Sequence, residues 1–291
     1  MDRSNEIREF LRSRRARITP EQAGLAPDPR VRRVPGLRRE EVARLAGVSV
    51  DYYVRLERGR TLGVSESVLD AVARALRLNT TERAHLFDLA QPTAGRARPE
   101  RPLAPQRVHP SLHRALDAFA SPAMVQGRRM DVLAANRLGH ALITDFQALP
   151  HRDRNIARFV FLDETAEALY PDWEQVAGDC VATLRVYAGR HPDDPLLTEL
   201  VGELSLRSAA FRRMWAEHDV LVHTTGTKRL RHPVVGDLTL DYVVLAAEGD
   251  PEQTLVLYTA EPGSPSAEAI DILASWIGTG ARSSEGTPRT A

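Results

Sequence analysis

Before residue 92, apolar positions recur at the three- and four-residue spacing of amphipathic helices. The pattern begins in residues 5–15 and predicts five short helices in all. The positions expected to face a common core are Ile7, Phe10 and Leu11, then Val42, Leu45 and Ala46, then Tyr53 and Leu56, then Val68, Leu69, Val72 and Leu76, and finally Leu86 and Leu89. Ser49 is placed to cap one helix, and Asn79 with Glu82 predicts a capping box at the start of the last. The first part of the chain is therefore predicted to be all α-helical.

Beyond residue 108, helical and strand patterns are mixed. Helical spacing covers residues 111–120, 136–147, 152–160, 173–190, 195–205 and 208–217. Runs rich in Val, Leu, Thr and Tyr predict strands over residues 123–127, 130–135, 220–224, 228–232, 237–247 and 253–260. Ser264 and Pro265 then begin a final helix. Because strands at both ends enclose a helical middle, we expect an α+β domain with one antiparallel sheet and inserted helices.

The stretch from Gln91 to Pro105 separates these two patterns. It holds four prolines and no apolar periodicity, which is typical of an extended connector. We therefore expect a helical domain over residues 5–91, a linker over 92–108 and the α+β domain over 109–277. Residues 278–291 are predicted to be a disordered tail, because they are rich in Gly, Ser, Thr and Arg.

The net charge of zero hides an uneven distribution. Residues 1–107 carry 22 arginines and 14 acidic residues, whereas the remainder carries 17 basic and 25 acidic residues. Of the 16 aromatic residues, 12 lie in the second part. A basic first part suits a polyanionic partner, and an aromatic second part suits a larger core or a pocket. Lys228 is the only lysine, which we attribute to a GC-rich coding bias rather than to function.

Several classes of protein are disfavoured by composition. The single cysteine, Cys180, excludes an internal disulfide and a cysteine-based zinc site. No window approaches 18 uncharged apolar residues, and the first 30 residues are rich in arginine without an apolar signal core. The sequence therefore predicts a cytoplasmic protein that neither spans a membrane nor is secreted.

Residues 38–59 contain the most informative motif. Two short helices meet at Gly47-Val48-Ser49, where a glycine supplies the left-handed backbone that an interhelix turn needs. Ala43 is small where the helices approach, Val48 fills the angle between them, and Leu56 anchors the second helix. This arrangement is that of a helix-turn-helix, whose second helix enters the major groove of DNA.

The motif resembles the lambda-repressor-like (Xre/Cro-type) helix-turn-helix family. Segments Phe10–Arg15 and Val34–Glu41 are also typical of regulators with this architecture. The second part resembles the MmyB-like ligand-binding domain over Arg128–Asn136, Asp194-Pro195, Val201–Leu204, Trp215–Val220, Lys228–Pro233 and Tyr258–Ser266. Together the two resemblances imply a five-helix DNA-binding domain followed by a PAS-like sheet domain that holds a fatty-acyl-like effector.

The resemblance also assigns roles to residues around the recognition helix, Ser49 to Arg58. Its exposed face, expected to contact bases, is Ser49, Val50, Asp51, Tyr52 and Arg55. Arg55 would donate two hydrogen bonds to guanine, whereas Asp51 would either accept one from cytosine or only stabilise the helix dipole. The expected phosphate contacts are Arg38, Arg39, Arg58 and Arg60, unless these arginines form only a solvated face.

One segment departs from the family pattern. After Gly59-Arg60 the family often has Pro-Ser, whereas this chain has Thr61-Leu62-Gly63-Val64-Ser65. We expect Ser65 to cap the next helix all the same.

The second domain shows no catalytic signature. It lacks Gly-x-Ser-x-Gly, a phosphate loop and His-Glu-x-x-His, and we expect neither metal nor cofactor. Cys180 lies on an amphipathic helix and is expected in the core, and the pair His109 and His113 is broken by Pro110. The candidate ligand contacts are Asn136, Arg231 and His232 for a carboxylate or amide, with Phe159, Phe161 and Tyr258 as apolar lining. The apolar residues could equally fill a core, and the polar ones could equally make a strand-end hydrogen bond or carry surface charge.

We therefore expect a sequence-specific DNA-binding transcription regulator. It is predicted to bind a palindromic operator as a homodimer and to respond to a small effector. Two alternatives stay open. The chain could be a protein-interaction scaffold built from the same folds, or the second domain could hold an unrecognised enzyme that regulates its own expression.

Overall fold

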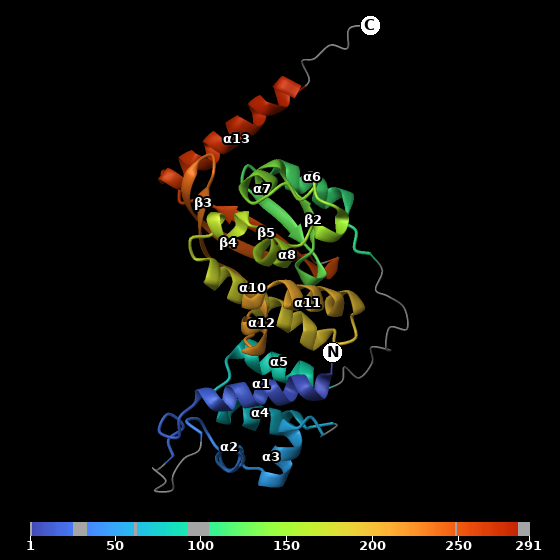
Figure 1. The fold of residues 1–291 in the computed structure, drawn as a ribbon, viewed down its shortest axis with the longest axis vertical. Helices are drawn as coiled ribbons and strands as arrows, with labels where there is room; N and C mark the ends of the chain where they lie inside the picture. The colour runs from blue at the N-terminus through green and yellow to red at the C-terminus, as the bar shows by residue number, and fades with distance from the viewer. Residues whose placement is uncertain (1, 26–33, 61–62, 92–104, 248, 285–291) are drawn as a thin grey trace. The chain divides into compact units, whose positions relative to one another are not determined.

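The computed structural model describes residues 2–25, 34–60, 63–91, 105–247 and 249–284 (Figure 1). The chain divides into two units. The first unit comprises residues 1–103 and 181–222, and the second comprises residues 104–180 and 223–291. The first unit therefore takes in a segment that the sequence assigned to the second domain. The predicted linker over residues 92–108 lies, up to residue 104, outside the described residues.

Five short helices form the N-terminal part of the first unit, as predicted. They are α1 (Arg3–Arg17), α2 (Arg39–Ala46), α3 (Val50–Glu57), α4 (Glu66–Ala75) and α5 (Thr80–Ala90). The predicted capping box at α5 is confirmed: Asn79 Oδ1 accepts from the Glu82 amide at 2.9 Å, and Glu82 Oε2 accepts from the Asn79 amide at 3.0 Å. Ser65 occupies the predicted N-cap position of α4 in an extended conformation, but its side chain makes no cap hydrogen bond.

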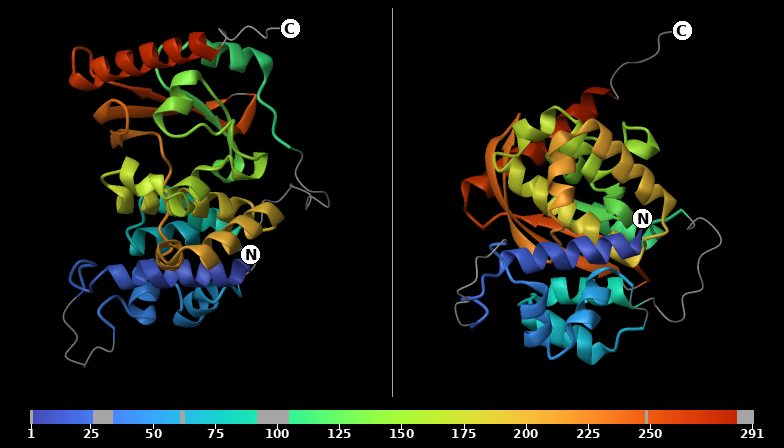
Figure 2. Two further views of the ribbon diagram at one scale, coloured as in Figure 1. Left: turned by 45° about the horizontal axis from the view of Figure 1, so that its top comes forward. Right: turned by 60° about the horizontal axis from the view of Figure 1, so that its bottom comes forward.

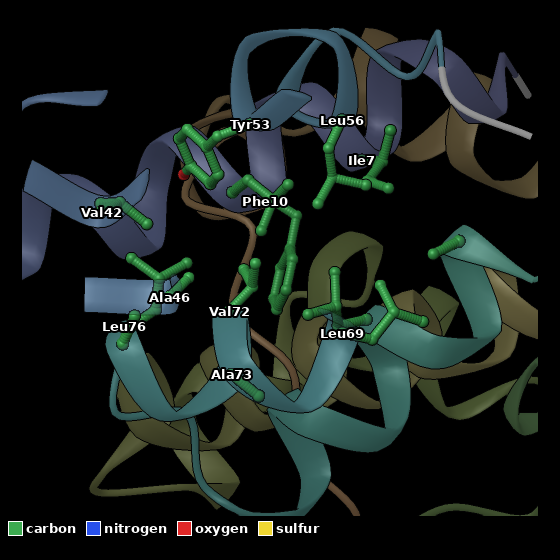
Figure 3. Packing of buried hydrophobic residues seen from close by; sticks show 14 of the residues in the cluster. Ile7, Phe10, Val42, Ala46, Tyr53, Leu56, Leu69, Val72, Ala73 and Leu76 are labelled. Atoms are coloured by element: carbon green, nitrogen blue, oxygen red, sulfur yellow. The ribbon is translucent and has the colours of Figure 1, made fainter. Parts of the chain in front are cut away.

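The core of these helices is centred on α1 (Figure 3). Phe10, Leu11 and Tyr53 are completely buried, and α1 packs against both α3 and α5. One predicted core position is wrong. Leu45 is 36% exposed, because the buried face of α2 is formed by Glu41, Val42, Ala43 and Ala46.

Helices from the C-terminal half of the sequence complete the first unit. They are residues 181–190 of α10 (Trp173–Arg190), then α11 (Pro195–Arg207) and α12 (Ala209–Ala216). Val186 and Val220 belong to the same hydrophobic cluster as the residues of α1 to α5. Within this unit, α1 and α5 lie between α11–α12 and the pair α2–α3 (Figure 1).

The second unit contains a five-stranded sheet in the order β2-β1-β5-β4-β3. The strands are β1 (Ala123–Gln126), β2 (Val132–Ala135), β3 (Thr225–His232), β4 (Gly236–Ala247) and β5 (Asp250–Thr259), and each neighbouring pair is antiparallel. The predicted strand over residues 220–224 is wrong, because these residues adopt no strand conformation and β3 begins only at Thr225. The α+β architecture with inserted helices is confirmed, and the likeness to a PAS-type sheet stays a prediction.

The remaining helices cover this sheet. They are α6 (Pro110–Ala118), α7 (Arg137–Leu142), α8 (Ile156–Leu162), α9 (Thr165–Leu169), the first residues of α10, and α13 (Pro265–Ser284), with short 3-10 turns at Arg128–Met130 and His151–Asp153. Leu116 of α6 packs on one face of the sheet, against Ala123 and Val125. The last helix, α13, packs against β4 and α7 (Figure 2) and continues past Ile277 to Ser284, where the sequence predicted a disordered tail. Residues 285–291 of that predicted tail lie outside the described residues.

Candidate functional site

The turn between α2 and α3 has the predicted geometry. Gly47 adopts a φ of +66°, in the left-handed region that suits glycine. The Val48 amide donates to the carbonyl of Ala43 at 3.0 Å, which closes the end of α2. Ser49 Oγ then accepts from the Tyr52 amide at 3.1 Å and starts α3. These local hydrogen bonds fix the angle at which α3 leaves the body of the helical bundle.

The first turns of α3 face away from the core. Val50 is 47% exposed, and Ser49, Asp51 and Arg55 are exposed as well. Tyr52 is half-buried, and the Arg55 guanidinium lies 5.9 Å from the centre of its ring, within the range of a cation–π contact. The structure thus brings the five predicted base-contacting residues to one accessible surface of the first unit.

The four predicted phosphate contacts lie around this helix. Arg39, Arg58 and Arg60 are exposed, and Arg38 is half-buried. Two acidic residues at the start of α2 compete for the same region. Glu41 Oε2 accepts from the Arg38 amide at 2.6 Å, and Glu40 lies 3.6 Å from the Arg38 guanidinium. The N-terminus of α2 therefore already has a carboxylate partner, and the arginine side chains carry the positive charge of this surface.

The residue that holds this surface in place, Glu57, was not predicted from the sequence. Glu57 ends α3, is 1% exposed, and accepts hydrogen bonds from Arg15 Nε at 3.2 Å and from Arg39 Nε at 2.9 Å. It therefore ties α3 to both α1 and α2. Its position, four residues after Tyr53 and next to Leu56, places an acidic residue on the buried face of α3, and that signal was available in the sequence.

A second buried charge network lies elsewhere in the first unit. The Arg185 side chain of α10 is completely buried, and its Nη1 lies 2.6 Å from Glu6 Oε2 in α1 and 2.9 Å from His218 Nδ1. Arg185 also donates to the Trp215 carbonyl and stacks over the Trp215 ring at 4.0 Å. Burial lowers the pKa of Arg185 to about 10 and raises the pKa of Glu6, although Arg185 opposes that increase. The network joins α1 of the helix-turn-helix part to α10 and to the loop after α12.

His85 packs beside this network without hydrogen-bond partners. It is 1% exposed, it meets the Phe10 ring edge-on at 5.1 Å, and neither ring nitrogen has a partner among the described residues. A Cβ atom at Gly189 would lie 2.6 Å from the His85 ring, so the ring rests directly on the backbone of α10. Burial, and then the charge of Arg185, lower the pKa of His85 to about 3.

We expect His85 to make the stability of the protein depend on pH. In the unfolded chain the His85 imidazole has a pKa near 6.5 and is protonated below that pH. In the folded protein it stays neutral down to about pH 3. Stability should therefore fall as the pH drops below about 6.5, and His85→Gln should reduce the loss between pH 7 and 5 by about 2 kcal/mol. Urea unfolding at both pH values measures this. The exposed His113 gives the control, since His113→Gln should leave the pH dependence as it is; equal pH slopes for wild type and His85→Gln would contradict the assignment.

The second unit contains a cavity of about 50 Å³. It is lined by the sheet, by α8 and α10, and by the segments that follow β1 and α7. Its apolar lining residues are Met130, Ile143, Ile156, Val160, Val176, Val244 and Val256. Its polar and titratable lining residues are Gln126, Tyr170, Cys180, His223, Lys228, Tyr242 and Tyr258.

Most of the predicted ligand contacts lie outside this cavity, and only Tyr258 is among its lining residues. Asn136 is 4% exposed, and its Oδ1 accepts from the amides of Ala123 at 3.0 Å and Gly139 at 2.8 Å. His232 lies with Nε2 2.8 Å from the Ala141 carbonyl, while Arg231 is exposed beside Asp237. These polar groups therefore have internal or surface partners.

The two phenylalanines predicted as pocket lining are packed among other aromatic rings. The centre of the Phe159 ring lies 6.1 Å from that of Phe146 and 6.4 Å from that of Tyr170. The centres of the Phe161 and Trp173 rings are 5.9 Å apart. Both are buried core residues, which was the alternative that their apolar character left open.

Burial shifts the pKa values of several titratable groups that line the cavity. His223 Nδ1 lies 2.8 Å from Tyr242 Oη, and burial lowers the pKa of His223 to about 4. Burial also lowers the pKa of Lys228 and raises the pKa of Cys180 to about 12, so that the cysteine is a thiol at neutral pH. Cys180 Sγ lies 3.5 Å from Met130 Sδ, in the core position that the sequence predicted.

The described residues contain no group of three or more His, Cys, Asp or Glu side chains arranged to hold a metal ion. In the same part of the chain, no helix combines the length and the apolar character that crossing a bilayer requires.

The fold and the exposed α3 define a DNA-binding protein of the helix-turn-helix class. A family model for a helix-turn-helix domain matches residues 6–86, and a model described as the MmyB-like transcription regulator ligand binding domain matches residues 108–273. The second match spans more than half of the chain, which therefore belongs to the family of MmyB-like transcription regulators. No curated protein matches the chain. These are families of transcription regulators, which are typically not enzymes.

Proposed function

We propose that this regulator binds a palindromic operator as a homodimer, with α3 of each copy in the major groove. The observation that carries this proposal is the exposed N-terminal face of α3, where Val50, Asp51 and Arg55 point away from the core of the first unit. Helix-turn-helix modules read DNA with this part of the second helix. Dimers of such modules place two recognition helices about one turn of DNA apart, and such a spacing matches a palindrome.

The two kinds of arginine contact predict different mutant phenotypes. Arg55→Ala should cost about 1–3 kcal/mol of discrimination at one base pair, because Arg55 is expected to read a guanine edge. Arg39→Ala should weaken binding to all sequences alike and reduce the salt slope, log Kd against log salt concentration, by about one unit per monomer contact. Because Arg39 also pairs with Glu57, circular dichroism checks that this variant is folded under the conditions of the binding assay. Fluorescence anisotropy with operator and random DNA at several salt concentrations measures both effects.

The control for these variants is Arg207→Ala. Arg207 is an exposed arginine of α11 that pairs with Glu203 at 3.1 Å. Helix α11 lies on the side of α1 and α5 away from α3 (Figure 1). Its loss changes the net charge by the same amount and should change neither sequence preference nor the salt slope. Arg55→Ala is expected to lose more affinity for the operator than for random DNA, and Arg39→Ala to lose the same affinity for both. If both variants show equal losses on the two DNAs, the assignment of base and phosphate contacts is wrong.

We further propose that the effector is an acyl compound bound in the cavity of the second unit. The apolar lining supports an acyl tail, and the polar residues support a head group. A cavity of about 50 Å³ accommodates about four water-sized groups, so a longer tail requires side chains to move. Met130 is suited to such movement, because its side chain is flexible and its backbone φ of +64° is strained.

An effector changes DNA binding only through different affinities for two arrangements of the dimer. We therefore expect an acyl ligand such as octanoate to change operator affinity by about fivefold or more, a typical allosteric coupling. Gel-shift titrations with and without octanoate measure this change. Unchanged operator affinity across acyl ligands that bind the protein would indicate that the second domain is purely structural.

A further inference from the structure

Lys228 is the only lysine in a chain that uses arginine for every other basic side chain. A coding bias toward arginine explains why the basic residues at the surface are arginines, because either cation is suitable there. It does not explain why this one position keeps lysine. Lysine differs from arginine in having a compact ammonium group, whereas the guanidinium is a broad planar fork. The position of Lys228 in the fold shows where the compact cation is needed.

The Lys228 side chain lines the cavity from β3. Its ammonium lies 5.5 Å from the centre of the Tyr242 ring and 5.9 Å from that of Tyr170. It makes no hydrogen bond and no ion pair with any of the residues that the structure describes. The Asp179 carboxylate attracts it electrostatically without forming an ion pair. Lys228 is thus a half-buried cation that contacts two aromatic faces and has Asp179 as a counter-charge beyond ion-pair distance.

A half-buried cation in such a place has no hydrogen-bond or ion-pair partner among the described residues, and only the more distant charge of Asp179 opposes its own. Removing a charge from water is unfavourable unless a counter-charge or strong hydrogen bonds compensate, and two ring contacts compensate only in part. An anionic group beside the ammonium would supply the missing partner. Within the cavity, the apolar side chains of Ile143, Val160 and Val176 would then contact the rest of the same molecule.

We propose that Lys228 anchors the ligand of this cavity by pairing its ammonium with the carboxylate of a small organic acid. This inference rests on the proposed binding of an effector in the cavity and adds the residue that recognises its head group. The carboxylate displaces no hydrogen-bond or ion-pair partner, because Lys228 has none among the described residues. The selectivity that follows is for acids over their neutral amides or esters of the same shape.

The single lysine allows a direct test on the full-length protein. An amine-acetylating reagent can modify only Lys228 and the chain's α-amino group, and mass spectrometry of the peptides follows both. Octanoate at about ten times its Kd or more should slow acetylation of Lys228 by about tenfold or more, because only the unliganded ammonium is free to react, while the α-amino group reacts at an unchanged rate. The isosteric octanamide should give no such protection. Equal protection by acid and amide would overturn the proposal.

Calorimetry of two variants provides the second measurement. Lys228→Met should weaken octanoate and butyrate binding by about tenfold or more and leave the binding of the matching amides as it is, and Lys228→Arg should restore the affinity for acids only in part. Circular dichroism checks that both variants fold. Undiminished acid binding by Lys228→Met, or no binding of either acid to wild type, would overturn the proposal. If octanoate binds through Lys228 but does not change operator affinity, the anchor stands and the proposed regulation fails.

Discussion

Arg185→Met should lower the free energy of unfolding of the first unit by about 3–5 kcal/mol, the cost of breaking a buried ion pair on one side. The methionine keeps much of the volume of arginine, so the loss comes mainly from charge and hydrogen bonding. Glu6 would keep a negative charge in a site where burial already raises its pKa, and the Trp215 carbonyl would lose its donor. Urea unfolding followed by tryptophan fluorescence measures the change.

Two further variants test whether the ion pair is the cause. Arg190→Met changes another arginine of α10, but Arg190 is about half exposed and pairs with Asp88 at the surface, so it should cost less than about 1 kcal/mol. Adding Glu6→Gln to Arg185→Met should recover part of the stability, because the orphaned carboxylate is removed. A loss below about 1 kcal/mol for Arg185→Met would show that the network contributes little.

Glu57→Gln is expected to have the second-largest effect, a loss of about 3 kcal/mol of unfolding free energy. Glu57 is buried and is the shared partner of Arg15 and Arg39, so the amide would leave two guanidinium groups without their counter-charge. This loss of unfolding free energy lies at the low end of the range for buried ion pairs, because the Arg39 side chain is 43% exposed and water screens its charge in part. Thermal and urea unfolding at pH 7 measure the loss.

Glu9→Gln provides the matched control for Glu57→Gln. Glu9 pairs with Arg12 at 3.2 Å on the exposed face of α1, where an ion pair between residues three apart contributes about 0.5 kcal/mol or less. If the two glutamine variants lose the same stability, burial of Glu57 is not what gives the pair its strength.

Features that depend on a few consecutive residues were predictable from the sequence. The five N-terminal helices, the left-handed turn at Gly47 and the capping box at Asn79 all follow from local periodicity and from hydrogen bonds within four residues. The outward face of α3 was predictable for the same reason, since the helical period that buries Tyr53 and Leu56 exposes Val50 and Arg55. The strands of the sheet were mostly found by their β-branched and alternating pattern.

Predictions failed where neighbours distant in the sequence decide the outcome. Residues 220–224 have strand-like composition, but Val220 packs instead in the core of the first unit. Leu45 has the apolar character of a core residue, yet it is 36% exposed. In each case the residue type permits two environments, and tertiary packing selects one.

The sequence by itself determined the helix-turn-helix and the class of protein, because short-range patterns encode both. Only the tertiary structure decided the rest. It pairs Glu6 with Arg185, 179 positions apart, and it brings Lys228, Tyr170 and Tyr242 together from separate elements. The physical reason is that a helix or a turn is fixed by bonds between near neighbours, whereas a buried charge or a cavity is defined by whatever the folded chain places around it.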